Sequence, residues 1–348
     1  MLNDPLRIGS ITVKNRIAIP PMVCFDWVGE DGLVSENHIA HYERLARGGA
    51  GLIIVEATAV TKEGRLHETE LGLWEDGQIP GMKRIADAIH VGGAKAFIQL
   101  VHAGGNGVSD PAMAPSDMLY RENIRGREMT EGQMLSVRRA FVAAALRAKR
   151  AGFDGVELHG CHGYLISCFC STVRNRRTDA YGQDRTLFAR QTLADVRTAC
   201  GPEYTVGIRL AAFEPRLEDG LRNAKAIAPL CDFLDISYGA DCEAEKPEGF
   251  PCSAAVYGAQ RVKQLVPDKP VFGVDGINSR QDVLNALSGG IDMVDCGRVS
   301  LVDPAFAEHI LKDAPAGKCL HCRGKCAWNP GTGPDHAGKC PGRKLQEK

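Results

Sequence analysis

Three side chains that can donate protons or hydrogen bonds follow one short strand-like segment near the middle of the chain. The segment is residues 153–158, and His159, His162 and Tyr164 come directly after it. Its brevity and its Phe, Val and Leu residues predict a buried strand. Two imidazoles and a phenol can donate to an anionic or carbonyl oxygen. We therefore predict an acid–base site at the C-terminal end of this strand.

The composition argues against several classes of protein. The chain has 348 residues, with 42 Lys and Arg against 43 Asp and Glu. This balance, without a long basic block, argues against a nucleic-acid partner. No apolar run approaches the roughly 20 residues of a membrane span, and the first residues do not resemble a signal peptide. We expect a cytoplasmic enzyme with a small-molecule substrate and no membrane partner, and the sequence leaves assembly into a homo-oligomer open.

Strand-like runs alternate with longer helical patterns along most of the chain, as in parallel strands joined by crossover helices. Eight runs have the apolar character of strands buried on both faces: 16–19, 52–56, 96–100, 155–158, 205–209, 233–236, 271–274 and 293–296. The clearest helical patterns are 36–48, 81–91, 130–151, 187–200 and 280–287. Eight units predict an α/β fold of the (β/α)8 TIM barrel type. A Rossmann-type sheet is the weaker reading, because the early strands lack a Gly-x-Gly-x-x-Gly turn.

Two regions are expected in the chain. Residues 1–313 would form the barrel, with a hairpin in residues 1–15 that covers its bottom. Residues 314–348 lie outside the eightfold pattern and are rich in Gly, Pro, Lys and Cys. The long polar segment 101–129 is expected to be a loop, either one that faces the substrate or a plain surface excursion.

Small or polar residues occupy the predicted strand ends, where a barrel places its active site. These residues are Pro20, Pro21, Met22, Val23, Ala57, Gln99 and Arg209. The seventh strand is followed by Gly276, and the eighth by Gly297 and Arg298. Barrels commonly bind phosphate at this position through backbone N–H groups and a nearby cation. The sequence therefore predicts a phosphorylated ligand.

A series of motifs in the same order resembles the old yellow enzyme family of flavin oxidoreductases over about residues 1–312. The motifs are Asn15-Arg16-Ile17 with Pro21-Met22, Glu56-Ala57, Gln99-Leu100-x-His102-Ala103-Gly104, Ala114-Pro115-Ser116, His159-x-x-His162-Gly163-Tyr164-Leu165, Asn175-x-Arg177-x-Asp179-x-Tyr181-Gly182, Gly276 and Gly297-Arg298. The resemblance implies a barrel that binds FMN. It also implies hydride transfer from reduced FMN to the β-carbon of an α,β-unsaturated carbonyl compound, either an enone or an enoyl or dienoyl thioester.

The resemblance also implies a role for each candidate residue. His159 and His162 would hydrogen-bond the carbonyl oxygen of the substrate, and Tyr164 would donate the proton to the α-carbon. The flavin contacts would come from Pro20, Pro21, Met22, Val23 and Ala57 along the ring system, Gln99 at the pyrimidine edge and Arg209 near N1. Gly276, Gly297 and Arg298 would bind the FMN phosphate.

Four cysteines crowd the C-terminal region in a pattern that suits a metal. They are Cys319, Cys322, Cys326 and Cys340. Four thiolates can hold either a zinc ion or a [4Fe-4S] cluster. The triplet with a distant fourth cysteine resembles the cluster segment of the 2,4-dienoyl-CoA reductase and trimethylamine dehydrogenase branch of the same family. That resemblance favours iron–sulfur, with zinc as the alternative.

The source of electrons stays open at this stage. In that branch a flavodoxin-like and dinucleotide-binding region follows the cluster, whereas this sequence stops at Lys348. We expect an external electron-donor protein, either a flavoprotein or a ferredoxin, that docks near residues 314–348. Direct reduction of FMN by NAD(P)H is the rival.

Two other functions compete with the ene-reductase reading. The cluster-bearing branch includes amine dehydrogenases and demethylases, which oxidise a C–N bond and pass electrons outward through the cluster. The chain could also be a flavin-binding or electron-transfer subunit of a larger complex. The presence of Tyr164 argues against a barrel that has lost its catalytic activity.

Overall fold

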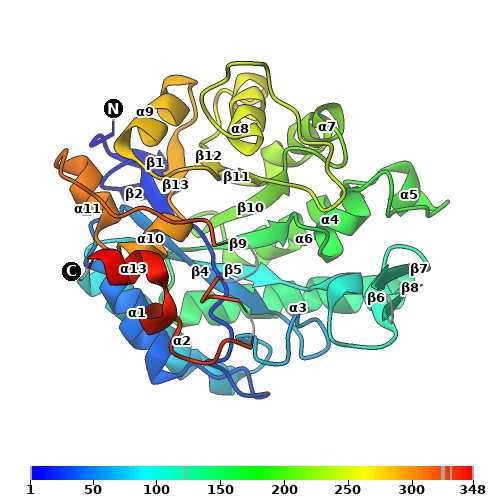
Figure 1. The fold of residues 1–348 in the computed structure, drawn as a ribbon. Helices are drawn as coiled ribbons and strands as arrows, with labels where there is room; N and C mark the ends of the chain where they lie inside the picture. Colours follow the sequence, from blue (N-terminus) through cyan, green and yellow to red (C-terminus); the bar gives the residue numbers. More distant parts are fainter. Residues whose placement is uncertain (1, 122–123, 323–325, 330, 347–348) are drawn as a thin grey trace.

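Eight parallel strands form a closed barrel at the centre of the molecule (Figure 1). The computed structural model describes the whole chain except residues 1, 122–123, 323–325, 330 and 347–348. The barrel strands are β3 (Ile17–Ile19), β4 (Leu52–Ala59), β5 (Lys95–Val101), β9 (Gly155–Gly160), β10 (Thr205–Ala211), β11 (Leu234–Ser237), β12 (Val271–Val274) and β13 (Met293–Asp295). Strand β13 pairs with β3 and closes the barrel. The eight predicted strands and the TIM-barrel fold are confirmed, with strand ends that differ by a few residues.

Helices cover the outside of the barrel (Figure 1). The principal helices are α1 (Glu36–Ala46), α2 (Ile79–Val91), α3 (Glu131–Arg150), α6 (Leu187–Cys200), α7 (Leu217–Ile227), α8 (Ala254–Leu265) and α9 (Arg280–Ser288). Helix α3 begins where the sequence predicts, because the Thr130 side chain accepts a hydrogen bond from the Gln133 backbone N–H. Shorter helices are α4 (Leu165–Cys170), α5 (Ala180–Gln183), α10 (Arg298–Val302), α11 (Phe306–Leu311), α12 (His336–Lys339) and α13 (Pro341–Gln346), with 3-10 turns η1 (Asp76–Gln78), η2 (Gly104–Asn106) and η3 (Ala228–Leu230).

An N-terminal hairpin closes the bottom of the barrel, as the sequence predicts. Strands β1 (Leu6–Ile8) and β2 (Ile11–Val13) pair antiparallel. Ile8 and Val13 belong to the same buried cluster as Phe97, Phe233 and Phe272 from the barrel interior. The rings of Phe97 and Phe233 stack at 5.3 Å, and those of Phe233 and Phe272 at 4.8 Å. This aromatic layer fills the bottom, so the opposite end is the one left for a ligand.

The segment 101–129 is more ordered than the sequence indicates. It contains η2 and a small sheet of β6 (Ala112–Ala114), β7 (Met118–Arg121) and β8 (Ile124–Glu128). Asn106 donates from its side chain to the Gly163 carbonyl at 2.8 Å. The segment 101–129 therefore contacts the loop that carries His162 and Tyr164.

The C-terminal extension packs against the loop between β3 and α1. The Trp27 indole donates to the Pro334 carbonyl at 2.7 Å, and its ring lies 6.0 Å from that of Trp328. His336 is buried and stacks on Trp328 at 5.1 Å. Figure 1 shows α13 against the side of the barrel near α1 and α10. The extension thus covers the wall that carries Met22 and Cys24.

Among the residues that the structure describes, no helix has the length and apolar character needed to cross a membrane.

Candidate active site

The three predicted acid–base residues meet at the C-terminal end of β9. The ring centroids of His159 and Tyr164 are 4.6 Å apart, those of His159 and His162 are 5.1 Å apart, and those of His162 and Tyr164 are 6.3 Å apart. His159 is the last inward-pointing residue of β9, because Gly155 and Glu157 precede it at a spacing of two. The strand and the turn after it therefore bring all three groups together.

Backbone geometry and a serine fix the position of His162. Its φ is 59°, in the left-handed region that non-glycine residues rarely occupy. The Nε2 atom of its ring lies 2.9 Å from the Ser237 hydroxyl at the end of β11. Gly163 follows with a φ of 76°, and its backbone N–H donates to the Ser167 hydroxyl. A tight turn thus presents the imidazole at the top of the barrel.

Both imidazoles favour the neutral form. Burial, with a smaller contribution from the positive charge of Arg209, lowers the pKa of His162 to about 3. Burial lowers the pKa of His159 well below its usual value, with smaller contributions from His162 and Arg209. A neutral imidazole still carries one N–H donor. The pair can therefore hydrogen-bond a carbonyl oxygen without being protonated.

A layer of buried polar groups lies inside the barrel beneath this site. Gln99 donates to Glu157 at 2.7 Å, and Arg209 Nε lies 3.1 Å from Asp235 Oδ2. Asp295 completes the layer and is buried. Burial raises the pKa values of Glu157 and Asp295, and the nearby charge of Asp235 raises both further. The layer therefore favours one positive guanidinium among carboxyls that are partly neutral.

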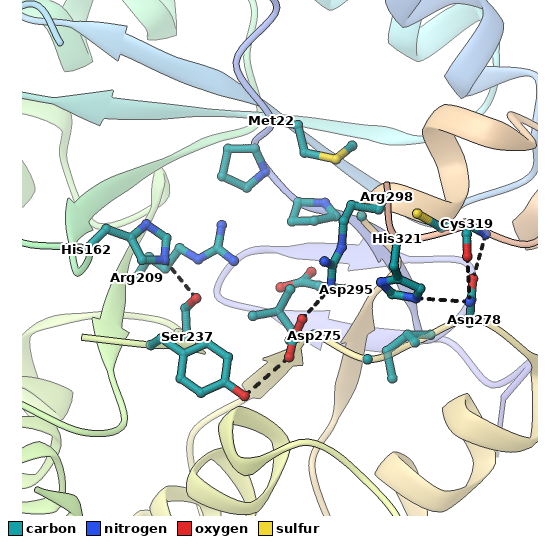
Figure 2. A pocket seen from close by; sticks show the side chains of 17 residues that line it. Met22, His162, Arg209, Ser237, Asp275, Asn278, Asp295, Arg298, Cys319 and His321 are labelled. Atoms are coloured by element: carbon teal, nitrogen blue, oxygen red, sulfur yellow. Dashed lines mark hydrogen bonds and ion pairs between the residues drawn. The ribbon is translucent and has the colours of Figure 1, made fainter. Parts of the chain in front are cut away.

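A cavity of about 230 Å³ opens above this layer. Figure 2 shows Met22, His162, Arg209, Ser237 and Arg298 around it. Among the candidate residues, its walls contain Pro20, Pro21, Met22, His162, Arg209, Gly276, Gly297 and Arg298. The structure thus joins the predicted ring-binding, carbonyl-binding and phosphate-binding residues in one space.

The predicted phosphate end has the backbone shape that an anion site needs. Asp275 and Gly276 have φ values of 84° and 74°, so the chain turns sharply after β12. A Cβ atom on Gly297 would come within 3.3 Å of Pro20 and 3.5 Å of Met22, so glycine leaves room there. Arg298 pairs with Asp275 at 2.6 Å. This end therefore combines open backbone with one half-exposed cation.

The other candidate residues lie around the cavity without appearing in its wall. Gln99 is buried in the polar layer, and Ala57 is buried on β4. Val23 is half-buried in the loop after β3. His159 is buried and Tyr164 is half-buried at the end of β9.

The four C-terminal cysteines surround a second, smaller cavity of about 30 Å³. Cys319, Cys322, Cys326 and Cys340 all line it, together with Leu301, Val302 and Trp328. Among the residues that the structure describes, no three of these sulfurs lie within 4.8 Å of one another. The same Cys319 also lines the larger cavity (Figure 2). The two sites are therefore neighbours.

Asn278 connects the two cavities. Its side chain accepts a hydrogen bond from the Cys319 backbone N–H at 2.9 Å and donates to the Cys319 carbonyl at 3.2 Å. Asn278 lies two residues after Gly276, in the loop that would hold the phosphate. The first cysteine is therefore held directly by the barrel.

Several residues of the site escaped the sequence reasoning. They are Glu157, Asp235, Ser237, Asp275, Asn278 and Asp295. The signal that could have found the inward-facing ones is the alternation of a strand: Glu157 precedes His159 by two, and Asp235 precedes Ser237 by two.

A closed barrel with a cavity at the carboxyl ends of its strands defines the class of (β/α)8 enzymes. Comparison with known proteins narrows the class. The profile of the NADH:flavin oxidoreductase / NADH oxidase family matches residues 1–316. The chain belongs to this family of flavin-dependent oxidoreductases, and the resemblance to old yellow enzyme is confirmed.

Named relatives agree with this assignment. The chain is 41% identical over 248 residues to NADPH dehydrogenase of Halalkalibacterium halodurans, covering 69% of this chain and 73% of that protein. Histamine dehydrogenase from Rhizobium sp. 4-9 is 30% identical, with a TM-score of 0.77, over 90% of this chain and 48% of that one. A 2-naphthoyl-CoA reductase is 23% identical, with a TM-score of 0.86, over 98% of this chain and 58% of that one. The last two chains are thus much longer than this one.

Proposed function

We propose that the protein is an FMN-dependent ene-reductase that acts on an α,β-unsaturated carbonyl compound. The observation that carries the proposal is the group of His159, His162 and Tyr164, whose ring centroids lie within 6.3 Å of one another beside a cavity lined by two arginines. Neutral imidazoles suit an oxygen on which negative charge develops, and a phenol suits a carbon that must gain a proton.

The residues present fit FMN. Arg209 places a buried cation at the cavity. Gly297 has no side chain, and this leaves a space beside Pro20 and Met22 that a Cβ atom would narrow. FMN, when bound, would supply a hydride to the β-carbon of the substrate. Gln99 and Arg209 would hold its pyrimidine edge, Pro20, Pro21, Met22, Val23 and Ala57 its ring system, and Gly276, Gly297 and Arg298 its phosphate.

The chain's own groups would then complete the reaction. The N–H groups of His159 and His162 would bind the carbonyl oxygen, with Ser237 keeping the His162 ring in place. The Tyr164 hydroxyl would hold the proton that goes to the α-carbon. The wall of the cavity would exclude water from the reacting atoms.

For the C-terminal cysteines we favour a [4Fe-4S] cluster over zinc. Sulfurs on one tetrahedral zinc ion lie about 3.8 Å from one another, whereas no three of these four come within 4.8 Å in the described chain. In a four-iron cluster each thiolate binds a different iron, so the sulfurs are farther apart. Iron and sulfide analysis of the purified protein tests this assignment, and stoichiometric zinc without iron would reject it.

A cluster at this place would lie beside the flavin. Cys319 lines the cavity that also contains Met22, Gly276 and Arg298. This proximity supports electron supply through the extension, from a flavoprotein or ferredoxin that docks near residues 314–348. Anaerobic mixing with NADPH alone tests the idea, because rapid bleaching of the flavin would show that no partner is needed.

An amine dehydrogenase or demethylase is the second candidate. The 30% identity to histamine dehydrogenase and the cysteine-lined cavity favour it. Unlike amine oxidation, reduction of an enone needs a pair of groups that bind the carbonyl oxygen, and His159 and His162 would provide that pair. Mixing dithionite-reduced protein with a panel of cyclic enones decides the issue: flavin reoxidation supports the ene-reductase, and a flavin that stays reduced with every enone supports the amine route.

A further inference from the structure

His159 and His162 also belong to a second group, with Cys161, whose side chains can bind a metal ion. Their ligand atoms all lie within 4.8 Å of one another, and no other three His, Cys, Asp or Glu residues in the described part of the chain are so arranged. His159 and Cys161 are buried, and His162 is half-buried. Two nitrogens and a sulfur therefore converge on one point at the end of β9.

The spacing of one ligand pair, His159 and Cys161, suits a tetrahedral metal ion. His159 Nδ1 and Cys161 Sγ are 3.7 Å apart. With Zn–N near 2.05 Å and Zn–S near 2.3 Å, a tetrahedral ion separates its nitrogen and sulfur ligands by about 3.6 Å. Imidazole and thiolate are also the donors that ions of the zinc class prefer. The distance requires almost no rearrangement of this pair.

The surroundings can support the ion. His162 lines the main cavity, which gives the ion a route from solvent (Figure 2). Its ring already pairs with the Ser237 hydroxyl, and metal-bound imidazoles usually have such an oxygen partner. Asp235 lies in the barrel beneath and pairs with Arg209, with Oδ2 3.1 Å from Nε.

We propose that His159, Cys161 and His162 bind one divalent ion of the zinc class, and that this ion excludes carbonyl ligands from the active site. The Cys161 thiol loses its proton to solvent when its sulfur binds the ion, so no oxidant or reductant is involved. Metal binding itself does not depend on the proposed enzymatic function. The inhibitory consequence rests on the proposed function, because it requires the same imidazoles to bind the substrate oxygen.

Cobalt is a suitable probe, because a cobalt–thiolate bond gives a charge-transfer absorption. FMN-loaded protein is titrated anaerobically with Co²⁺, and difference spectra are recorded. We expect one equivalent with a sulfur-to-cobalt band in the wild type and loss of that equivalent in Cys161→Ser. Cys200→Ser, which removes another buried thiol at the end of α6, is the matched control and should retain it. Cys322→Ser distinguishes this ion from metal held by the C-terminal cysteines and should also retain it.

Ligand competition keeps the proposal testable if Cys161→Ser does not fold. Binding of a phenol to the oxidised wild-type protein is followed by the change in flavin absorbance. Zn²⁺ at ten times its dissociation constant should raise the apparent phenol dissociation constant about tenfold. Cobalt binding unaffected by Cys161→Ser, or phenol binding unaffected by bound zinc, would overturn the proposal. If cobalt binds as expected but no enone is reduced, the proposed function fails while the metal site stands.

Discussion

The ring of His162, on the turn after β9, lies 2.9 Å from the hydroxyl of Ser237 at the end of β11. The two residues are 75 positions apart in the chain, and β10 lies between their strands in the barrel. This contact holds one of the two imidazoles that would bind the substrate oxygen. Ser237 is therefore a positioning residue for the site.

Ser237→Ala should weaken the binding of phenols and carbonyl ligands. Loss of one orienting hydrogen bond is worth about 0.5–1.5 kcal/mol, which corresponds to roughly a two- to twelvefold rise in the dissociation constant. Flavin absorbance changes on ligand titration measure it. Ser237→Thr keeps the hydroxyl and should restore most of the affinity. Equal affinity in all three proteins would show that Ser237 does not position His162.

Tyr164→Phe should slow reoxidation of the reduced flavin by an enone while leaving flavin reduction unchanged. Loss of a general acid typically costs about a hundredfold or more. Stopped-flow measurement of the two half-reactions separates them. Tyr181→Phe is the matched control, because its hydroxyl bonds Gln191 and lies outside the site. Equal slowing of both half-reactions would contradict the assigned role.

Asn278→Ala should loosen the C-terminal cysteines from the barrel. Both of its hydrogen bonds to the Cys319 backbone would be lost. We expect less iron per protein after purification and faster loss of iron to a chelator. Asn285→Ala, which removes the same kind of side chain from helix α9, is the control. Unchanged iron retention would mean that Asn278 does not help to hold the cysteines.

Glu56→Gln tests how much the burial of one carboxyl, on strand β4, costs in stability. Burial raises the pKa of Glu56 to about 7, although the Cys24 backbone N–H and the Tyr42 hydroxyl donate to it. The folded state thus holds this proton more tightly than the unfolded state, whose carboxyl titrates near 4.5. The stability that the protonated form contributes is complete below about pH 4.5 and is lost as the pH rises through about 7.

The free energy of unfolding of the variant minus that of the wild type should therefore rise by about 3 kcal/mol as the pH is raised from 4.5 to 8. Denaturant unfolding at several pH values measures the difference. Glu203→Gln removes a carboxyl from an exposed position and serves as the control. A difference that is constant over this pH range would show that Glu56 does not titrate as described.

The fold was predictable because each barrel strand is buried on both faces and leaves a short apolar run in the sequence. His159, His162 and Tyr164 were predictable for a related reason, since they lie within six residues at the end of one such run. Local sequence determines both features. No contact between distant segments has to be known.

The remaining features depend on contacts across the fold. Glu157, Asp235 and Asp295 look like interruptions in three separate strands, and only barrel closure brings them around Arg209. The sheet in residues 101–129 has a polar sequence and is held by contacts such as that of Asn106 with Gly163. The contact between Cys319 and Asn278 joins residues 41 positions apart. Such pairings have no periodic signal.

A single-turnover experiment tests the central claim most directly. Protein with one equivalent of reduced FMN is mixed anaerobically with 2-cyclohexenone, and flavin absorbance and product are both measured. The account predicts that the flavin is reoxidised and that one saturated ketone forms per flavin. A flavin that remains reduced with the enone, together with bleaching of the oxidised protein by an amine, would contradict the account.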